Sequence, residues 1–186
     1  MTTSYAADLQ LFIDGAWRGG EGRDERPVFN PATANMIGAL PIASASDLDE
    51  ALAAAERGWP AWRSRTPDER GALMHKAADL IRERAEQIAA LLTIEQGKPI
   101  AEARGEVLSA AGLFDYFAEQ GKRIDGRVAQ RPSGQRALAI RQPVGPVAGF
   151  SPWNFPVNLM VKKIAPAIAA GCVVIAKAPE EAPAAT

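Results

Sequence analysis

The sequence is short of several residue types that define particular protein classes. It holds one cysteine, Cys172, in 186 residues, which excludes an internal disulfide and a metal site built from cysteines. No uninterrupted apolar stretch approaches the ~18 residues that a membrane span needs, and residues 1–10 lack the apolar core of a signal peptide. We therefore expect no metal site, no membrane span and a reducing, cytoplasmic setting.

An excess of one charge is also missing. The chain carries 21 Lys and Arg against 22 Asp and Glu, a net charge of −1, and has no basic run of five or more residues. This balance gives no electrostatic reason to expect nucleic acid or an anionic membrane as a partner. With 47% hydrophobic and 23% charged residues, the composition is that of a soluble globular protein.

Turn and cap signals divide residues 1–126 into short strands followed by helices. Asp14-Gly15 lies between two apolar pairs and favours a tight hairpin, and residues 36–42 predict a short strand. Ser46 can cap a first helix, for which helical spacing predicts a buried face. That face would carry Leu48, Leu52, Ala55 and Trp59.

Two further helices are indicated. Thr66-Pro67-Asp68-Glu69 has the pattern of a capping box, and it precedes an apolar stripe from Leu73 to Leu92 that we expect in the core. Gly97-Lys98-Pro99 is a stop signal for this helix. The next helix should end near Gly121 and bury one face, formed by Val107, Ala111, Phe114 and Ala118.

Residues 127–142 predict two short strands around the loop Arg131-Pro132-Ser133-Gly134. A single hairpin is only marginally stable in water. We therefore expect this one to join another sheet.

Residues 143–186 show a strand–helix–strand pattern. Residues 147–150 form a short apolar strand, and a helix beginning at Pro156 carries Met160, Ile164 and Ile168 on one face. Gly171 is suited to the left-handed conformation that ends a helix, and residues 172–176 are continuously apolar, as in a strand buried on both faces. The pattern predicts a βαβ unit of a parallel sheet, hence the α/β class, with a right-handed connection.

Polar groups follow both strands of this unit. The first strand leads into Asn154, and the second leads into Lys177 and Glu180. Because ligands bind beyond the carboxyl ends of parallel strands, these three side chains should share one edge. The Asn154 amide could donate to a developing oxyanion. Lys177 and Glu180 could bind a ribose, and an acid at the 2′-hydroxyl disfavours a 2′-phosphate, which separates NAD from NADP.

Each of these side chains also has a purely structural interpretation. Asn154 could cap the helix that begins at Pro156, and Lys177 with Glu180 could be a solvated pair. By residue type alone, Trp153 and Phe155 favour packing over cofactor contact. Three other side chains are expected to have no role in a site: His75, with no partner identifiable from the sequence, and Lys162 and Lys163 on an exposed helix face.

Six sequence blocks, in this order, resemble the aldehyde dehydrogenase superfamily, which is NAD(P)-dependent. The resemblance covers nearly the whole chain, from about residue 11 to residue 186, and the first two blocks resemble the semialdehyde dehydrogenase branch in particular. The blocks are Glu95-Gln96-Gly97-Lys98-Pro99, Glu119-Gln120-Gly121-Lys122-Arg123-Ile124, Pro143-Val144-Gly145, Ser151-Pro152-Trp153-Asn154-Phe155-Pro156, Ala169-Ala170-Gly171-Cys172, and Lys177 through Pro183.

The resemblance implies the N-terminal portion of an aldehyde dehydrogenase fold. Residues 1–126 would form a hairpin and the helical part of the cofactor-binding domain, residues 127–142 an oligomerisation hairpin, and residues 143–186 the first βαβ unit of an incomplete Rossmann-like sheet. It also implies a small-molecule aldehyde as substrate, oxidised to a carboxylic acid, with NAD as cofactor in preference to NADP, and a homo-oligomer.

The same resemblance assigns roles to site residues. Asn154 matches the asparagine that stabilises the oxyanion in catalysis, and Lys177 and Glu180 match the pair that holds the adenosine ribose. The loop that passes beside the cofactor is matched by Phe150, Ser151, Pro152 and Trp153.

Two departures from the family pattern bear on these roles. The family often has Lys-Pro-x-Glu, whereas Pro179 here lies one place later, with the Lys177–Glu180 spacing kept. Lys162 stands where the succinate semialdehyde branch commonly has an arginine that clamps the substrate carboxylate. Lysine cannot make that bidentate contact, which argues against succinate semialdehyde as substrate.

In the family, the nucleophilic cysteine, the general-base glutamate and the glycine-rich turn lie further along the chain than residue 186. Cys172 matches a different position, and in an apolar run we expect it to be buried and inert. The chain alone is therefore expected to be inactive. Two other functions stay open: a non-catalytic dinucleotide-binding or oligomerisation module, and a reductase of acyl phosphates or acyl-CoA on the same scaffold.

Overall fold

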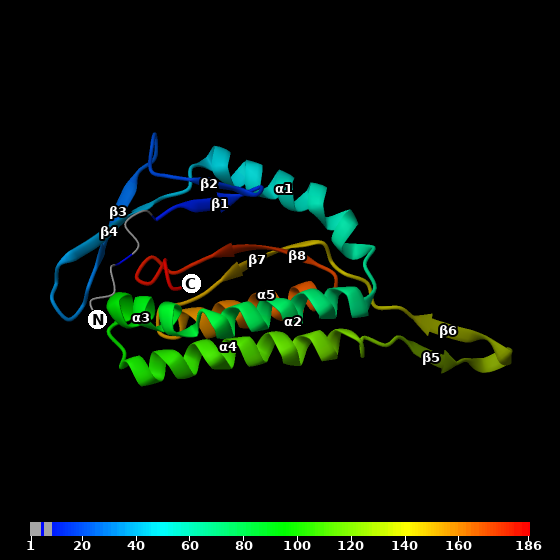
Figure 1. Ribbon diagram of the computed structural model, residues 1–186. Coiled ribbons are helices and arrows are strands. Elements are labelled where there is room, and N and C mark those ends of the chain that lie inside the picture. Colours follow the sequence, from blue (N-terminus) through cyan, green and yellow to red (C-terminus); the bar gives the residue numbers. More distant parts are fainter. Residues whose placement is uncertain (1–4, 6–8) are drawn as a thin grey trace.

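The computed structural model describes residue 5 and residues 9–186; residues 1–4 and 6–8, part of the segment searched for a signal peptide, lie outside the described residues. Figure 1 shows an α/β arrangement in which a parallel strand pair lies between one helix above it and a layer of helices below it. A long hairpin projects from one end. The α/β class predicted from the sequence is confirmed.

The N-terminal strands form two antiparallel hairpins. Strands β1 (Leu11–Ile13) and β2 (Ala16–Arg18) are joined at Asp14 and Gly15, whose φ values of 51° and 78° confirm the predicted tight turn. Strands β3 (Glu25–Phe29) and β4 (Met36–Pro41) pair next, which confirms the predicted strand near residues 36–42.

The residue that caps helix α1 (Ala45–Arg63) lies earlier in the chain than predicted. Ser44, not Ser46, is the cap: its hydroxyl accepts from the Asp47 amide, and the Asp47 carboxylate accepts from the Ser44 amide. The predicted buried face is wrong at Leu48 and Leu52, which are 53% and 51% exposed. Trp59, also in the predicted face, is partly buried, and with Trp62 it donates hydrogen bonds to carbonyls of α5 and of the turn after it.

The single helix predicted from Thr66 is two helices, α2 (Pro67–Glu83) and α3 (Ala85–Gln96), separated by the non-helical residue Arg84. The Thr66–Glu69 capping box is confirmed. The predicted core stripe is wrong at Leu73 and Leu80, which are 43% and 38% exposed. Both lie within α2, away from its buried side, which carries Gly71, Met74 and Ala78.

Helix α4 (Ile100–Gly121) runs through the centre of the helical layer. Its predicted buried residues Val107, Ala111, Phe114 and Ala118 all lie in the core, which is confirmed, as is its end at Gly121. Most core positions are alanines, so the helices approach closely. A Cβ at Gly121 would lie 3.1 Å from the carbonyl oxygen of Ala169, which leaves no room for a larger residue.

The predicted βαβ unit is confirmed. Strand β7 (Pro146–Phe150), helix α5 (Pro156–Ala169) and strand β8 (Val173–Lys177) follow in order, and β7 pairs with β8 in parallel. Gly171 has a φ of 89°, as predicted for the residue that ends this helix. Helices α1 and α5 contact the strand pair from opposite sides (Figure 1).

The predicted hairpin at residues 127–142 is present as β5 (Arg127–Gln130) and β6 (Arg136–Ala139), joined through a short 3-10 turn at Pro132–Gly134. It extends away from the helices (Figure 1). Val128 and Leu138 face each other in register and are 62% and 71% exposed. The hairpin thus presents apolar side chains without packing on the helical body.

The last carbonyl groups of α5 and the turn after it are bound by side chains of α1 and α2. The indole N–H groups of Trp59 and Trp62 donate to the carbonyls of Gly171 and Ile168, at 3.1 Å and 3.0 Å. The buried Arg70 donates from Nε to the Ala169 carbonyl at 3.1 Å. These donors replace the hydrogen bonds that a helix end lacks, and they fix α5 against α1 and α2.

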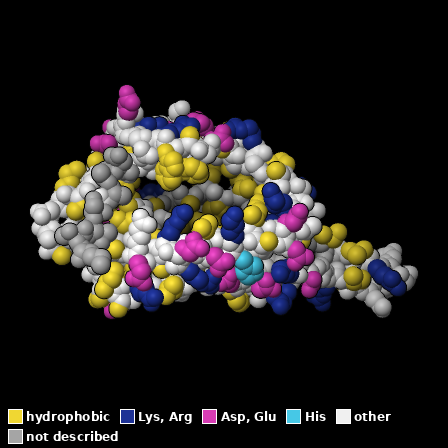
Figure 2. Space-filling model, in the orientation of Figure 1, with side chains coloured by type: hydrophobic (Ala, Val, Ile, Leu, Met, Phe, Trp, Pro, Cys, Tyr) yellow, Lys and Arg dark blue, Asp and Glu magenta, His cyan; other side chains and the backbone are white. Residues whose placement is uncertain are grey.

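His75 on α2 lies between two carboxylates of α4, partners that could not be identified from the sequence. Its Nδ1 is 2.6 Å from Asp115 and its Nε2 is 3.1 Å from Glu119. Figure 2 shows the histidine beside acidic side chains on the molecular surface. The hydrogen bond with Asp115, followed by that with Glu119, raises the pKa of His75. The partners come from a different helix, which is why the sequence did not reveal them.

Loss of the α2 cap should lower the stability of the fold. Thr66→Ala removes the hydroxyl that accepts from the Glu69 amide and is expected to cost about 1 kcal/mol of unfolding free energy. Thr66→Ser keeps the hydroxyl and serves as the control. Urea unfolding of the full-length protein checks this, and equal losses in both variants would contradict it.

The His75 contacts should make stability depend on pH in a defined direction. Because the folded pKa of His75 lies above the unfolded value, the stabilisation is complete below about pH 6.5 and is lost as pH rises through the folded pKa. The Tm difference between the wild type and His75→Gln should therefore shrink as pH is raised. A difference that grows with pH would refute the assignment.

Candidate site at the carboxyl edge of β7 and β8

The two parallel strands end side by side. Phe150 and Lys177 are register partners, and the Ser151 amide donates to the Lys177 carbonyl at 3.4 Å. The chain segments that leave β7 and β8 therefore start from neighbouring positions. The prediction that the two strand ends meet at one edge is confirmed.

Lys177 and Glu180 form an exposed ion pair at this edge. Lys177 Nζ donates to Glu180 Oε1 at 3.1 Å, and the other carboxylate oxygen of Glu180 pairs with Arg26 of β3. The hydrogen bond from Lys177 lowers the pKa of Glu180 the most, and the nearby Arg26 lowers it further. Arg26 was not predicted at this edge, because it lies 154 positions from Glu180 and no local sequence pattern indicates their contact.

Asn154 lies in the loop between β7 and α5 with its side chain exposed. Helix α5 begins after Phe155 and has no side-chain cap, so the alternative that Asn154 caps this helix is wrong. Among residue 5 and residues 9–186, no partner binds the Asn154 amide. Its backbone carbonyl, in contrast, accepts from Lys98 Nζ at 3.1 Å and from Gln96 Nε2 at 3.3 Å.

Beneath this loop is a buried ion pair between Lys98 and Glu106, whose side chains are 8% and 1% exposed. Glu106 Oε1 accepts from the amides of Val157 and Asn158, at 3.0 Å and 3.1 Å. Lys98 Nζ also lies 4.1 Å from the centre of the Phe155 ring. The start of α5 and the loop before it are thus bound to one charged pair.

A second buried carboxylate binds the segment that follows β8. Glu95 accepts from the amides of Ala184 and Ala185, each at 2.9 Å, and from the Tyr5 hydroxyl at 2.5 Å. Burial raises the pKa of Glu95. Residues 95–106, from the last turn of α3 into α4, therefore hold both of the chain segments that follow β7 and β8.

Glu95, Lys98 and Glu106 were not among the predicted site residues, although Glu95 and Lys98 lie in a block that resembles the family. A signal was present for Glu106. It falls at helical spacing between Ala103 and Ala110 on the buried face of α4, where a charged residue needs a partner.

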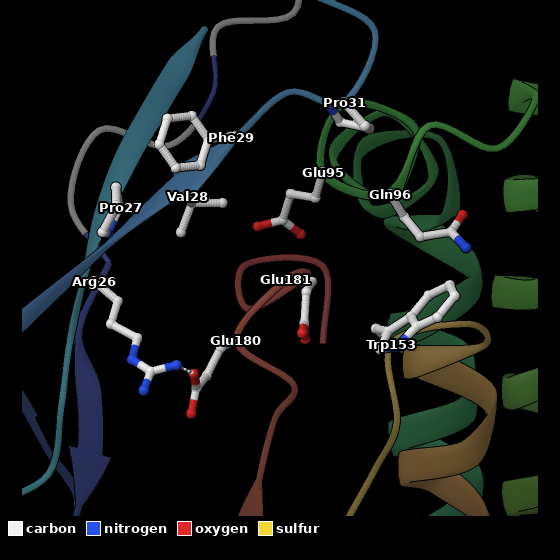
Figure 3. A pocket seen from close by; sticks show the side chains of 10 residues that line it. All are labelled: Arg26, Pro27, Val28, Phe29, Pro31, Glu95, Gln96, Trp153, Glu180 and Glu181. Atoms are coloured by element: carbon white, nitrogen blue, oxygen red, sulfur yellow. Dashed lines mark hydrogen bonds and ion pairs between the residues drawn. The ribbon is translucent and has the colours of Figure 1, made fainter. Parts of the chain in front are cut away.

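A cavity of about 430 Å³ opens beside Glu180 (Figure 3). It lies between β3, the end of α3 and the loop after β7, and Trp153 forms part of one wall. Its volume falls within the range of ligand pockets. Lys177 and Asn154 do not line it, so it forms only a portion of the candidate site.

The chemistry of this edge fits a dinucleotide. Lys177 and Glu180 offer a donor and an acceptor for a ribose diol, and the Ser151 hydroxyl is buried without a hydrogen-bond partner in the described chain. Phe150 and Trp153 are 64% and 55% exposed. This exposure goes against packing for Trp153, and Phe155, at 52%, is exposed as well.

The predicted burial of Cys172 and the predicted exposure of Lys162 and Lys163 are confirmed. Cys172 is buried at the opposite end of β8 from Lys177, and Lys162 and Lys163 are exposed. The described residues contain no group of three or more His, Cys, Asp or Glu side chains placed to hold a metal ion. None of the described helices combines the length and apolar character needed to cross a membrane.

Comparison with known proteins agrees with this geometry. The model of the aldehyde dehydrogenase family matches residues 17–186. A succinate semialdehyde dehydrogenase of Acinetobacter baylyi is 40% identical over 175 residues, covering 94% of this chain and 36% of the relative. A succinate-semialdehyde dehydrogenase [NADP(+)] of Escherichia coli is 38% identical with the same coverage.

The crystal structure of an aldehyde dehydrogenase from Brucella melitensis biovar abortus 2308 superposes with a TM-score of 0.92 at 40% identity. The match covers 96% of this chain and 37% of that one. The chain thus spans little more than a third of the length of these relatives, as an N-terminal portion. It belongs to the aldehyde dehydrogenase family.

Proposed function

We propose that this chain supplies the oxyanion donor and part of the cofactor site of an NAD(P)-dependent enzyme that oxidises an aldehyde to a carboxylic acid. The observation that carries the proposal is the parallel pairing of β7 with β8, which places side by side the strand ends that lead to Asn154 and to Lys177 and Glu180. Family membership, with semialdehyde dehydrogenases among the relatives, supports aldehyde oxidation as the reaction.

In this reaction the aldehyde and water give the acid, and the nicotinamide, when bound, accepts a hydride. The Asn154 amide, free of other partners among the described residues, donates to the aldehyde oxygen as it gains negative charge. A donor that is already in place needs no rearrangement when the charge develops. The Lys177 ammonium and the Glu180 carboxylate would hold a ribose diol, and Phe150, Ser151, Pro152 and Trp153 would form the adjoining wall.

We propose NAD in preference to NADP, because the Glu180 carboxylate would repel a 2′-phosphate. Arg26 modifies this preference, since it already pairs with Glu180 and could bind a phosphate if the carboxylate were removed. Both cofactors occur in the family, and one close relative carries NADP(+) in its name.

The relatives and one residue of α5 bear on the class of aldehyde that would be oxidised. Semialdehydes are the class that the relatives' names support. Lys162 is exposed on α5 and cannot form the bidentate contact that arginine makes with a carboxylate. We therefore propose an aldehyde other than succinate semialdehyde.

Assembly through the β5–β6 hairpin is the partner interaction that we propose. Its larger apolar residues Val128, Leu138 and Ile140 are more than half exposed and have no cover within the described chain. A second copy of the protein, adding a strand to this hairpin, would bury them.

Replacing Asn154 tests the proposed catalytic role. In the full-length protein, Asn154→Ala should lower kcat for aldehyde oxidation by about 10²–10³, because one oxyanion donor is lost. Binding of NAD, followed by fluorescence titration, should be unaffected. Asn158→Ala, which changes another asparagine one turn into α5, is the matched control and should retain most of the activity. Retention of kcat by Asn154→Ala would refute the role.

Replacing Glu180 tests cofactor selection. Glu180→Ser should improve NADP binding relative to NAD by about tenfold, equal to about 1.4 kcal/mol, and Arg26→Ala in the same chain should reverse much of that gain. Glu181→Ser removes a neighbouring carboxylate at the same cavity and is the control. An unchanged ratio of the two dissociation constants would contradict the assignment of Glu180.

A further inference from the structure

The Lys98–Glu106 pair is buried where burial is costly. Removing two charges from water carries a penalty that their attraction alone does not always offset, and apolar replacements of such pairs are often as stable. Stability alone therefore does not explain why such a pair is buried. The contacts that Lys98 and Glu106 make with other residues indicate a second role.

Each member of the pair binds a different end of one short segment. Lys98 Nζ donates to the carbonyl of Asn154, and Glu106 Oε1 accepts from the amides of Val157 and Asn158. The two side chains also bind each other. Residues 154–158 are thus held at both ends by a single unit, and the ring of Phe155 within the segment contacts Lys98.

The charges have the signs that this geometry requires. A carboxylate at the first turn of α5 complements the positive end of the helix dipole and satisfies amides that have no partner within the helix. An ammonium complements a backbone carbonyl. Hydrogen bonds to charged groups are shorter and stronger than neutral ones, so they fix the backbone of Asn154 more firmly than a neutral pair would.

We propose that Lys98 and Glu106 are positioning residues that fix the Asn154 amide in the geometry required for oxyanion stabilisation. This inference rests on the proposed function of Asn154. Neither residue touches the substrate, and both act through the backbone of residues 154–158. A displacement of about 1 Å in a catalytic group can lower the rate about 10²-fold, so residues that hold the Asn154 backbone in place affect the rate.

Kinetics of the full-length protein test the proposal through a double-mutant cycle. Lys98→Met should lower kcat by at least about tenfold while the dissociation constant of NAD changes little. In the Asn154→Ala background the same substitution should have almost no further effect on kcat, because the donor that it positions is gone. Glu106→Gln keeps an acceptor oxygen and should lower kcat less than Lys98→Met does.

Ser109→Ala is the matched control for this cycle. It removes another hydrogen bond between α4 and α5, from the Asn158 side chain, and leaves the contacts of Glu106 in place. We expect no coupling between this substitution and Asn154→Ala. Equal loss of kcat from Lys98→Met in both backgrounds would overturn the proposal and leave a role in stability alone.

Hydrogen exchange provides a readout that does not depend on activity. Mass spectrometry of the wild type and the variants should show faster exchange of the amides of residues 154–158 in Lys98→Met and Glu106→Gln, and no change there in Ser109→Ala. Unchanged exchange in the two pair variants would overturn the proposal. If Asn154→Ala itself leaves kcat unchanged, the oxyanion role has failed, and exchange then decides whether the pair holds this segment.

Discussion

Helix α5 is bound at its two ends by charges of opposite sign, and the candidate site depends on this constraint. Glu106 accepts from the amides of its first turn, and Arg70 donates to a carbonyl of its last turn. Both charges complement the helix dipole, and two tryptophan indoles add to the C-terminal end. Because β7 precedes α5 and β8 follows it, the fixed helix sets where the chain leaves β7 and where it enters β8.

The candidate site combines exposed side chains at the strand ends with buried charges behind them. The Asn154, Lys177 and Glu180 side chains are exposed or half-buried, whereas Glu95, Lys98 and Glu106 are buried. The buried charges come from the last turn of α3, the connection that follows it and the beginning of α4. This short stretch of chain binds both segments that leave the strand ends, and each of its buried charges is hydrogen-bonded, as buried charges must be.

Local signals predicted most of the secondary structure, because each depends on few neighbouring residues. The turn at Asp14-Gly15, the Thr66 capping box and the strand–helix–strand pattern from residue 146 were found in this way. Errors arose where burial depends on a distant partner. Leu48 and Leu52 are apolar and correctly spaced, yet they are exposed, whereas Trp59 and Trp62 further along α1 bind carbonyls at the end of α5 and in the turn after it. Leu73 and Leu80 are also apolar, but the buried side of α2 carries Gly71, Met74 and Ala78 instead.

The amino-acid sequence was sufficient for the α/β class, the family resemblance, and the meeting of the β7 and β8 ends at one edge, since parallel strands place their carboxyl ends together. It was insufficient for Arg26 beside Glu180, for the acidic partners of His75, and for the contacts of Lys98 and Glu106 with residues 154–158. Those pairs join residues far apart in the chain, and only the packing of helices and strands brings their charges within hydrogen-bonding distance.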